Sequence, residues 1–144
     1  MKHIFKPGDK KLHSFKITEA DLAAFHGVVV HSFCATFVLA REIEWTTRLF
    51  VLDMKEADEE GIGTRLEIIH KGPAFADEIM EIEAVIKSIA KNEILCTYRA
   101  RVGERLVAEG LTGQKIFSKQ RLAEIGKTEI RNPEKVSRSG RSEN

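Results

Sequence analysis

The sequence contains few cysteines, almost no net charge and no long uncharged apolar run. Its two cysteines, Cys34 and Cys96, form no C-x-x-C pair, so the chain does not resemble a disulfide scaffold and suits a reducing compartment. With 23 basic and 22 acidic side chains the formal net charge is +1, which gives no overall field to hold a polyanion. Nucleic acid is therefore not an expected partner.

Signals for export and for membrane insertion are also missing. The N-terminal residues 1–8 (MKHIFKPG) lack the apolar core of a signal peptide. The most apolar stretch, residues 33–54, is interrupted by too much charge for a helix that spans a bilayer. The charged residues within it are Arg41, Glu42, Glu44, Arg48 and Asp53. We therefore expect a soluble, cytoplasmic protein with no membrane partner.

The length of 144 residues and the hydrophobic content of 42% predict one globular domain. A chain of this size buries about 68% of its unfolded surface, which suffices for a core without disulfides or metal. We assign residues 1–117 to this domain. Residues 118–144 hold seven Lys or Arg against four Asp or Glu, which predicts a short helix over 120–125 and then a basic, disordered, solvated tail.

Hydrophobic periodicity predicts the elements of the first half. Residues 11–18 alternate loosely, as in a strand, and residues 18–25 suggest a short helical turn that ends at Gly27. Residues 34–54 carry an apolar band so wide that we expect a long helix buried on nearly all sides. The charged, glycine-punctuated residues 55–63 predict a loop.

The second half alternates as a series of strands. Alternation over residues 64–70, 78–90, 94–102 and 105–117 predicts long strands in hairpin succession, and Gly110 and Gly113 suggest a bulge or a close approach of another backbone. A long helix followed by such strands is typical of an α+β hot-dog fold, in which an antiparallel sheet of about five strands wraps a central helix. Pairing of an open edge strand across a two-fold axis predicts a homodimer or a dimer of dimers.

Two residues suggest acid–base chemistry. Glu44 lies inside the apolar band, where a carboxylate is costly without a partner; an ion pair with Arg41 or Arg48 is the simpler interpretation. His70 ends a strand just before a Lys-Gly-Pro turn, and its imidazole is suited to act as a base near neutral pH. A structural or merely exposed histidine is the alternative, and His13 is expected at the surface.

Other candidate residues have structural explanations. Thr36 can cap the N-terminus of the long helix, and a cysteine in an apolar context, such as Cys34, is more often packed than reactive. His26 and His31 lack the spacing that puts two imidazoles on one helix face, so we assign no metal. Residues 61–63 (GIG) are not followed by a third glycine, so no dinucleotide or other cofactor is expected.

The spacing of four residues resembles a known pattern. Thr36 is followed eight residues later by Glu44, and Gly63 is followed seven residues later by His70. Across residues 28–118 this pattern resembles the fluoroacetyl-CoA thioesterase-like branch of the hot-dog proteins. In that family a threonine, a glutamate and a histidine form the catalytic triad, and a glycine seven residues before the histidine lies at the substrate carbonyl. The resemblance implies these roles for the four residues.

The chain differs from that family at the positions that gate the fluoroacetyl pocket. The glycine that follows the family's threonine is Phe37 here, and the gating phenylalanines align with Val30 and Gly27, so a preference for fluoroacetate is not implied. A His-Glu-Arg run on the last strand is replaced by residues 112–114 (TGQ), so other basic residues would contact the CoA phosphates. Phe37 and Ile62 are expected to contribute to the substrate pocket.

The leading hypothesis is hydrolysis of a small or medium acyl-CoA thioester. Thr36 would attack the carbonyl or orient a water molecule, and His70 would take the proton. Glu44 would orient the imidazole, and the Gly63 amide would bind the oxyanion. Because eight helical residues separate Thr36 from Glu44 by about 12 Å, either Thr36 precedes the helix on a chain that folds back or two subunits complete the site.

The alternative function is a non-catalytic hot-dog module that binds acyl-CoA or a related ligand, since the same pocket would serve both. A hot-dog hydratase is disfavoured because the D-x-N-P-x-H type of signature that such enzymes resemble is absent.

Overall fold

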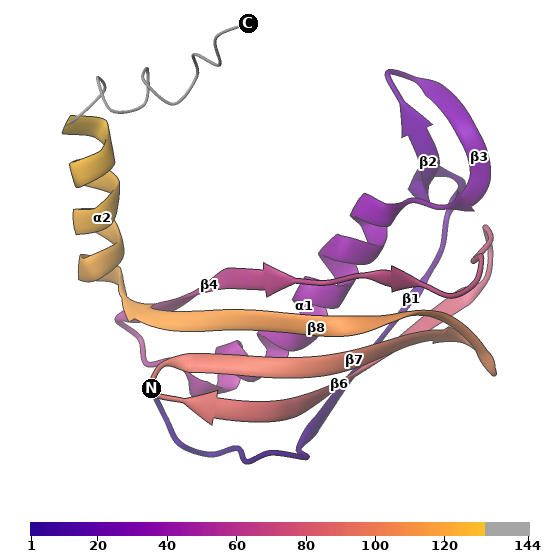
Figure 1. Ribbon diagram of the computed structural model, residues 1–144. Coiled ribbons are helices and arrows are strands. Elements are labelled where there is room, and N and C mark those ends of the chain that lie inside the picture. Colours follow the sequence, from indigo (N-terminus) through magenta and orange to yellow (C-terminus); the bar gives the residue numbers. More distant parts are fainter. Residues whose placement is uncertain (132–144) are drawn as a thin grey trace, which may run out of the picture.

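The computed structural model describes residues 1–131 and shows one long helix, α1 (Thr36–Met54), packed against a curled antiparallel sheet (Figure 1). The sheet follows the spatial order β1 (Lys10–Lys16), β6 (Ile79–Ala90), β7 (Glu93–Val102), β8 (Arg105–Ser118) and β4 (Glu59–Leu66), and the short strand β5 (Ile69–His70) also pairs with β8. The predicted α+β arrangement of a long helix on a sheet of about five strands is confirmed.

The core lies between α1 and the face of the sheet that the helix covers. Along the strands, every second side chain points toward the helix, as expected for strands with one buried face. The buried side chains include Met80, Ile82, Ala84 and Ile86 of β6, Ile94, Cys96, Tyr98 and Ala100 of β7, and Val38, Leu39, Ile43, Phe50 and Val51 of α1. This packing fixes the helix relative to the strands that carry the candidate site.

The helix begins at Thr36, close to the predicted start, but the prediction that it is buried on nearly all sides is wrong. Phe37, Trp45 and Leu52 are 54%, 44% and 38% exposed. Their spacing places them on one face of the helix, and the sheet covers the opposite face. An exposed apolar strip of this kind is typical of an interface.

The segment expected as a helical turn is largely a β-hairpin. Only one turn of 3₁₀ helix forms, at Glu19–Asp21, and the chain then pairs β2 (Leu22–Phe25) with β3 (Val28–Cys34). His26 and Gly27 join the strands with φ values of +51° and +79°, as in the two-residue turns that favour tight hairpins. The hairpin projects beyond the sheet beside the start of α1 (Figure 1).

Strand β4 starts at Glu59, inside the segment expected to be a loop. It runs close to the helix: a Cβ atom on Gly61 would lie 2.6 Å from Cγ1 of Val51. Only glycine therefore lets the strand approach α1 this closely. The strand forms one edge of the sheet, next to β8.

The chain bends between β4 and β5, and the bend places His70. A Cβ atom on Gly110 would lie 2.1 Å from the Glu67 carbonyl oxygen, and the Tyr98 hydroxyl donates a hydrogen bond of 2.7 Å to that same oxygen. The close backbone approach predicted at Gly110 is therefore confirmed. Beyond the bend, His70 on β5 lies opposite Ala108 of β8.

The last described element, α2 (Lys119–Arg131), is longer than the helix predicted over 120–125. The disorder predicted after residue 125 is therefore wrong for residues 126–131, which continue the helix, and for residues 132–144 it lies outside the described residues. Within residues 1–131, no helix is both long enough and apolar enough to cross a membrane.

Candidate active site

Thr36 and His70 lie together at the N-terminal end of α1. The residue that caps the helix is Ala35, and no side chain caps it, so the prediction that Thr36 is the N-cap is wrong. The Thr36 hydroxyl instead lies 3.2 Å from Nε2 of His70. When the imidazole proton is on Nδ1, the hydroxyl donates a hydrogen bond to Nε2, which is the geometry a base needs to take its proton.

The first turn of α1 supplies positive electrostatic potential at the same place. The Ala35 amide donates to the Asp21 carbonyl oxygen at 2.8 Å, and the Val38 amide donates to the Ala35 carbonyl oxygen at 3.1 Å. The amides of Thr36 and Phe37 have no acceptor within the helix. They point out of its positive end, where they can stabilise a developing negative charge.

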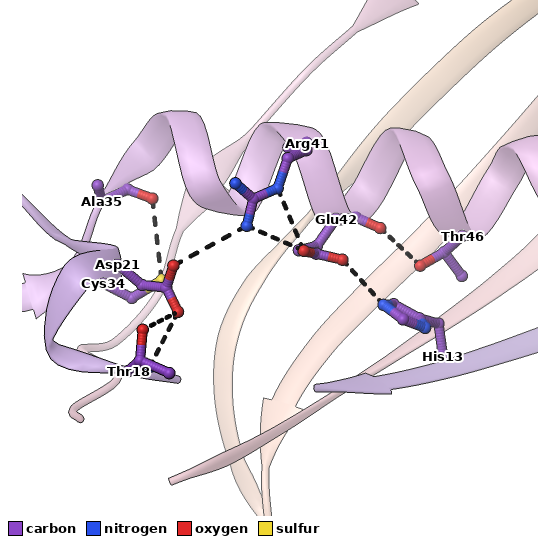
Figure 2. Close-up of polar contacts among 8 residues, drawn as sticks. All are labelled: His13, Thr18, Asp21, Cys34, Ala35, Arg41, Glu42 and Thr46. Carbon is purple, nitrogen blue, oxygen red and sulfur yellow. Dashed lines mark hydrogen bonds and ion pairs between the residues drawn. The ribbon is translucent and has the colours of Figure 1, made fainter. Parts of the chain in front are cut away.

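A polar network holds the start of α1 against β1 and the 3₁₀ turn (Figure 2). Asp21 accepts hydrogen bonds from the amide and the hydroxyl of Thr18, and Arg41 lies 3.9 Å from the Asp21 carboxylate. Arg41 also donates to Glu42, whose other carboxylate oxygen lies 2.8 Å from Nε2 of His13. The network fixes the helix end that carries Thr36.

Glu44 is not held by the ion pairs predicted for it. Arg41 pairs with Glu42 and Asp21, and Arg48 donates to Glu60 of β4 at 2.8 Å. The ion-pair interpretation of Glu44 is therefore wrong. The carboxylate instead lies against the edge strand, where a Cβ atom on Gly63 would be 3.2 Å from its Oε1 atom.

Glu44 and Gly63 share a cavity of about 520 Å³. The other residues that line it are His13, Arg41, Glu42, Trp45, Arg48, Gly61 and Gln114. The sequence did not indicate that two of them, His13 and Gln114, line this cavity. His13, expected at the surface, is part-buried against Glu42, and Gln114 donates a buried hydrogen bond of 2.7 Å to the Thr47 hydroxyl.

Thr36 and His70 line a different cavity of about 450 Å³. On β8, His70 lies opposite Ala108 and Gly63 lies opposite Gln114. Six strand residues at about 3.3 Å each put the two positions about 20 Å apart. The four candidate residues therefore form two pairs in one chain, Thr36 with His70 and Glu44 with Gly63. Because Thr36 starts the helix itself, the alternative in which it lies on a preceding segment that folds back is wrong.

The two apolar residues predicted for the substrate pocket lie at the surface of the single chain. Phe37 is 54% exposed and packs edge to face against Phe25 of the hairpin, with ring centroids 6.5 Å apart. Ile62 is 42% exposed on the edge strand. Neither belongs to the described residues that line the two cavities.

Cys34 lines the Thr36 cavity but is poorly suited to be a nucleophile. Its side chain is buried, and burial, reinforced by the charge of Asp21, raises the pKa of the thiol to about 11. The thiol therefore stays protonated near neutral pH. Within residues 1–131, no group of three or more His, Cys, Asp and Glu side chains is placed to hold a metal ion.

For the thioester hydrolysis expected from the sequence, we predict that Cys34→Ser keeps kcat within about threefold of wild type, because a protonated thiol does not attack the carbonyl carbon. Iodoacetamide at pH 7.5 is expected to label Cys34 slowly, as it does Cys96, whose pKa burial raises to about 12. Mass spectrometry and residual activity follow both events. Rapid labelling of Cys34 with parallel loss of activity would contradict the assignment.

Comparisons with known proteins identify the family and the fold. The family model described as fluoroacetyl-CoA-specific thioesterase matches residues 17–120. A hypothetical protein of Thermus thermophilus, described as a thioesterase superfamily member, superposes with a TM-score of 0.84 at 22% identity, covering 92% of this chain and 98% of its own. A hot-dog-like protein from Thermanaerovibrio acidaminovorans superposes with a TM-score of 0.75 at 16% identity, covering 83% and 89%.

A variant of the fluoroacetyl-CoA-specific thioesterase FlK, solved with fluoroacetate and CoA, superposes with a TM-score of 0.76 at 14% identity, covering 82% of this chain and 99% of its own. No curated protein sequence matches the chain. The predicted hot-dog fold is confirmed by these structural relatives.

Proposed function

Since the chain belongs to the family of fluoroacetyl-CoA-specific thioesterases, we propose that it hydrolyses a small or medium acyl-CoA thioester at the cavity beside Thr36 and His70. The observation that carries the proposal is the 3.2 Å contact between the Thr36 hydroxyl and Nε2 of His70 at the N-terminus of α1. A nucleophile, a base and helix amides then meet at one point, as acyl transfer requires.

The proposed reaction begins with proton transfer to His70. Nε2 takes the proton of the Thr36 hydroxyl, or of a water molecule that this hydroxyl orients, and the oxygen attacks the thioester carbonyl carbon. The first-turn amides of α1 and the amide of the partner subunit's Gly63 stabilise the oxyanion. The C–S bond breaks, and His70 returns the proton to the leaving sulfur. If Thr36 is acylated, a water molecule activated by His70 then releases the acid.

We further propose that the working enzyme is a homodimer in which Glu44 and Gly63 of the partner subunit complete each site. Their distance from His70 within one chain leaves them without a role there. The exposed strip of Phe37, Trp45 and Leu52 borders the edge strand β4, which has one unpaired side in the described part of the chain. If a two-fold axis pairs the β4 edges of two subunits, the dimer covers both the apolar strip and the unpaired edge. The two α1 helices then lie side by side in opposite directions.

Release of free thiol from acyl-CoAs tests the proposed function. We expect a thiol-reactive dye to report turnover with acetyl-, butyryl-, hexanoyl- or octanoyl-CoA, and the Thr36→Ala variant to be strongly impaired. If acyl-CoA stabilises the protein against heat while none of the four releases thiol, the chain is a binding module and the hydrolase proposal is wrong.

A further inference from the structure

We infer that the cavity beside Thr36 and His70 holds the acyl chain, and that it selects unsubstituted medium-length acyl groups over acetyl. This inference rests on the proposed function and names the substrate class of the same site. The residues that line the cavity are His31, Phe33, Cys34, Thr36, Leu39, His70, Gly72, Pro73, Ala74 and Val107.

The chemistry of the wall favours a hydrocarbon. The described lining residues include no Asp, Glu, Lys or Arg, and the deepest of them, Leu39, Ala74 and Val107, are 1%, 2% and 1% exposed. The polar side chains Thr36 and His70 point toward each other. A methylene chain in this cavity would gain by leaving water, whereas a charged or strongly polar acyl group would lose its hydration without a charged partner among these lining residues.

The volume of the cavity favours an acyl chain longer than acetyl. Within one subunit the cavity measures about 450 Å³, and a methylene group is comparable in size to a water molecule, which occupies about 30 Å³ of the liquid. An acyl chain of roughly eight to twelve carbons would fill most of this space, whereas the two carbons of acetyl would leave most of it empty. Because unfilled apolar space loses dispersion contacts, the short substrate is expected to bind less well.

The outer wall of the cavity is supported rather than loose. Phe33 packs edge to face against Phe75, with ring centroids 5.5 Å apart, and the Arg105 guanidinium lies 5.5 Å from the centroid of the Phe75 ring. Arg105 also donates to the Glu78 carboxylate. The Cys34 amide donates to the Ala74 carbonyl oxygen at 2.8 Å, which ties β3 to the segment that precedes β6. These contacts hold the wall in place, so the cavity offers a limited volume and chain length should have an optimum.

Turnover of straight-chain acyl-CoAs from acetyl to palmitoyl by the wild-type protein is the primary test. Each added methylene is expected to raise kcat/KM about fourfold until the cavity is filled. The optimum should fall at roughly eight to twelve carbons, and longer chains should gain nothing more. Acetyl-CoA as the best substrate, or a rate independent of length, would overturn the inference.

A cavity variant and a matched control locate the effect. Leu39→Ala enlarges the cavity and is expected to move the optimum about two methylenes longer. Ile43→Ala removes a fully buried side chain one turn further along the same helix, outside the lining residues, and should leave the optimum unchanged. Thermal unfolding checks that both variants fold. An optimum that moves equally in both variants, or in neither, would overturn the assignment of the cavity.

Binding of S-alkyl-CoA thioethers, which cannot be hydrolysed, separates this inference from the proposed function. We expect calorimetry with the wild-type protein to show affinity that increases with alkyl length up to the same optimum. Length-dependent binding without any acyl-CoA hydrolysis would refute the hydrolase and keep the cavity. Hydrolysis combined with length-independent binding would refute the cavity and keep the hydrolase.

Discussion

Replacing His70 by alanine is expected to lower kcat for acyl-CoA hydrolysis by about 10²- to 10⁴-fold, the range that a positioned general base supplies. The imidazole is the only base within hydrogen-bond distance of the Thr36 hydroxyl among the described residues, and threonine is too weakly acidic to react unaided. His70 is exposed on a two-residue strand, so the fold should survive. Steady-state kinetics and circular dichroism measure the two effects.

The matched control for that variant is His31→Ala. His31 is also exposed and lines the same cavity, but its Nδ1 atom accepts a hydrogen bond from the Phe33 amide at 3.1 Å. Its loss should change kcat by no more than about threefold, because it holds no proton that the reaction uses. Wild-type turnover by His70→Ala would remove the histidine from the mechanism.

Replacing Glu44 by glutamine is expected to lower kcat by about 10²-fold or more, although in its own chain the residue lies far from His70. Glutamine keeps the shape of the side chain but cannot stabilise the imidazolium that forms when His70 takes a proton. The result would therefore favour a site completed by Glu44 of the partner subunit. Steady-state kinetics at saturating acyl-CoA provides the measurement.

Glu42→Gln is the control for Glu44→Gln, because Glu42 lines the same cavity and is already committed to Arg41 and His13. We expect this control to cost some stability, through the weakened pairs at the start of α1, and to keep kcat within about threefold. Equal losses of kcat in the two variants would mean that Glu44→Gln acts through lost stability and that Glu44 has no role in catalysis.

The strands were predictable from sequence because each has one buried face. Residues 78–90 and 94–102 alternate apolar and polar side chains, and the strands observed differ from them by one residue at one end. The β2–β3 hairpin was missed because residues 28–30 are three consecutive valines with no alternation. His13 was assigned to the surface although Phe15, two residues on along β1, shares its inward orientation.

The site was predictable only in part. The resemblance placed Thr36 and His70 in one site, and the structure brings them to 3.2 Å; their catalytic roles remain predictions. That Glu44 forms no ion pair with Arg41 or Arg48 could not be predicted from helical spacing alone. Arg48 pairs with Glu60, which belongs to a strand that the charged sequence had suggested to be a loop. The exposure of Trp45 could not be predicted either, because hydrophobic periodicity does not distinguish a core from an interface.

Mixing two inactive variants tests the central claim most directly. In a homodimer of Thr36→Ala and Glu44→Gln subunits, one site would combine the intact Thr36 and His70 of one subunit with the intact Glu44 of the other. After subunit exchange, random pairing makes half of the dimers mixed, each with one working site, so about one-quarter of wild-type activity should return. A mixture that stays as inactive as its two components, with exchange verified by mass spectrometry, would contradict a site shared between subunits.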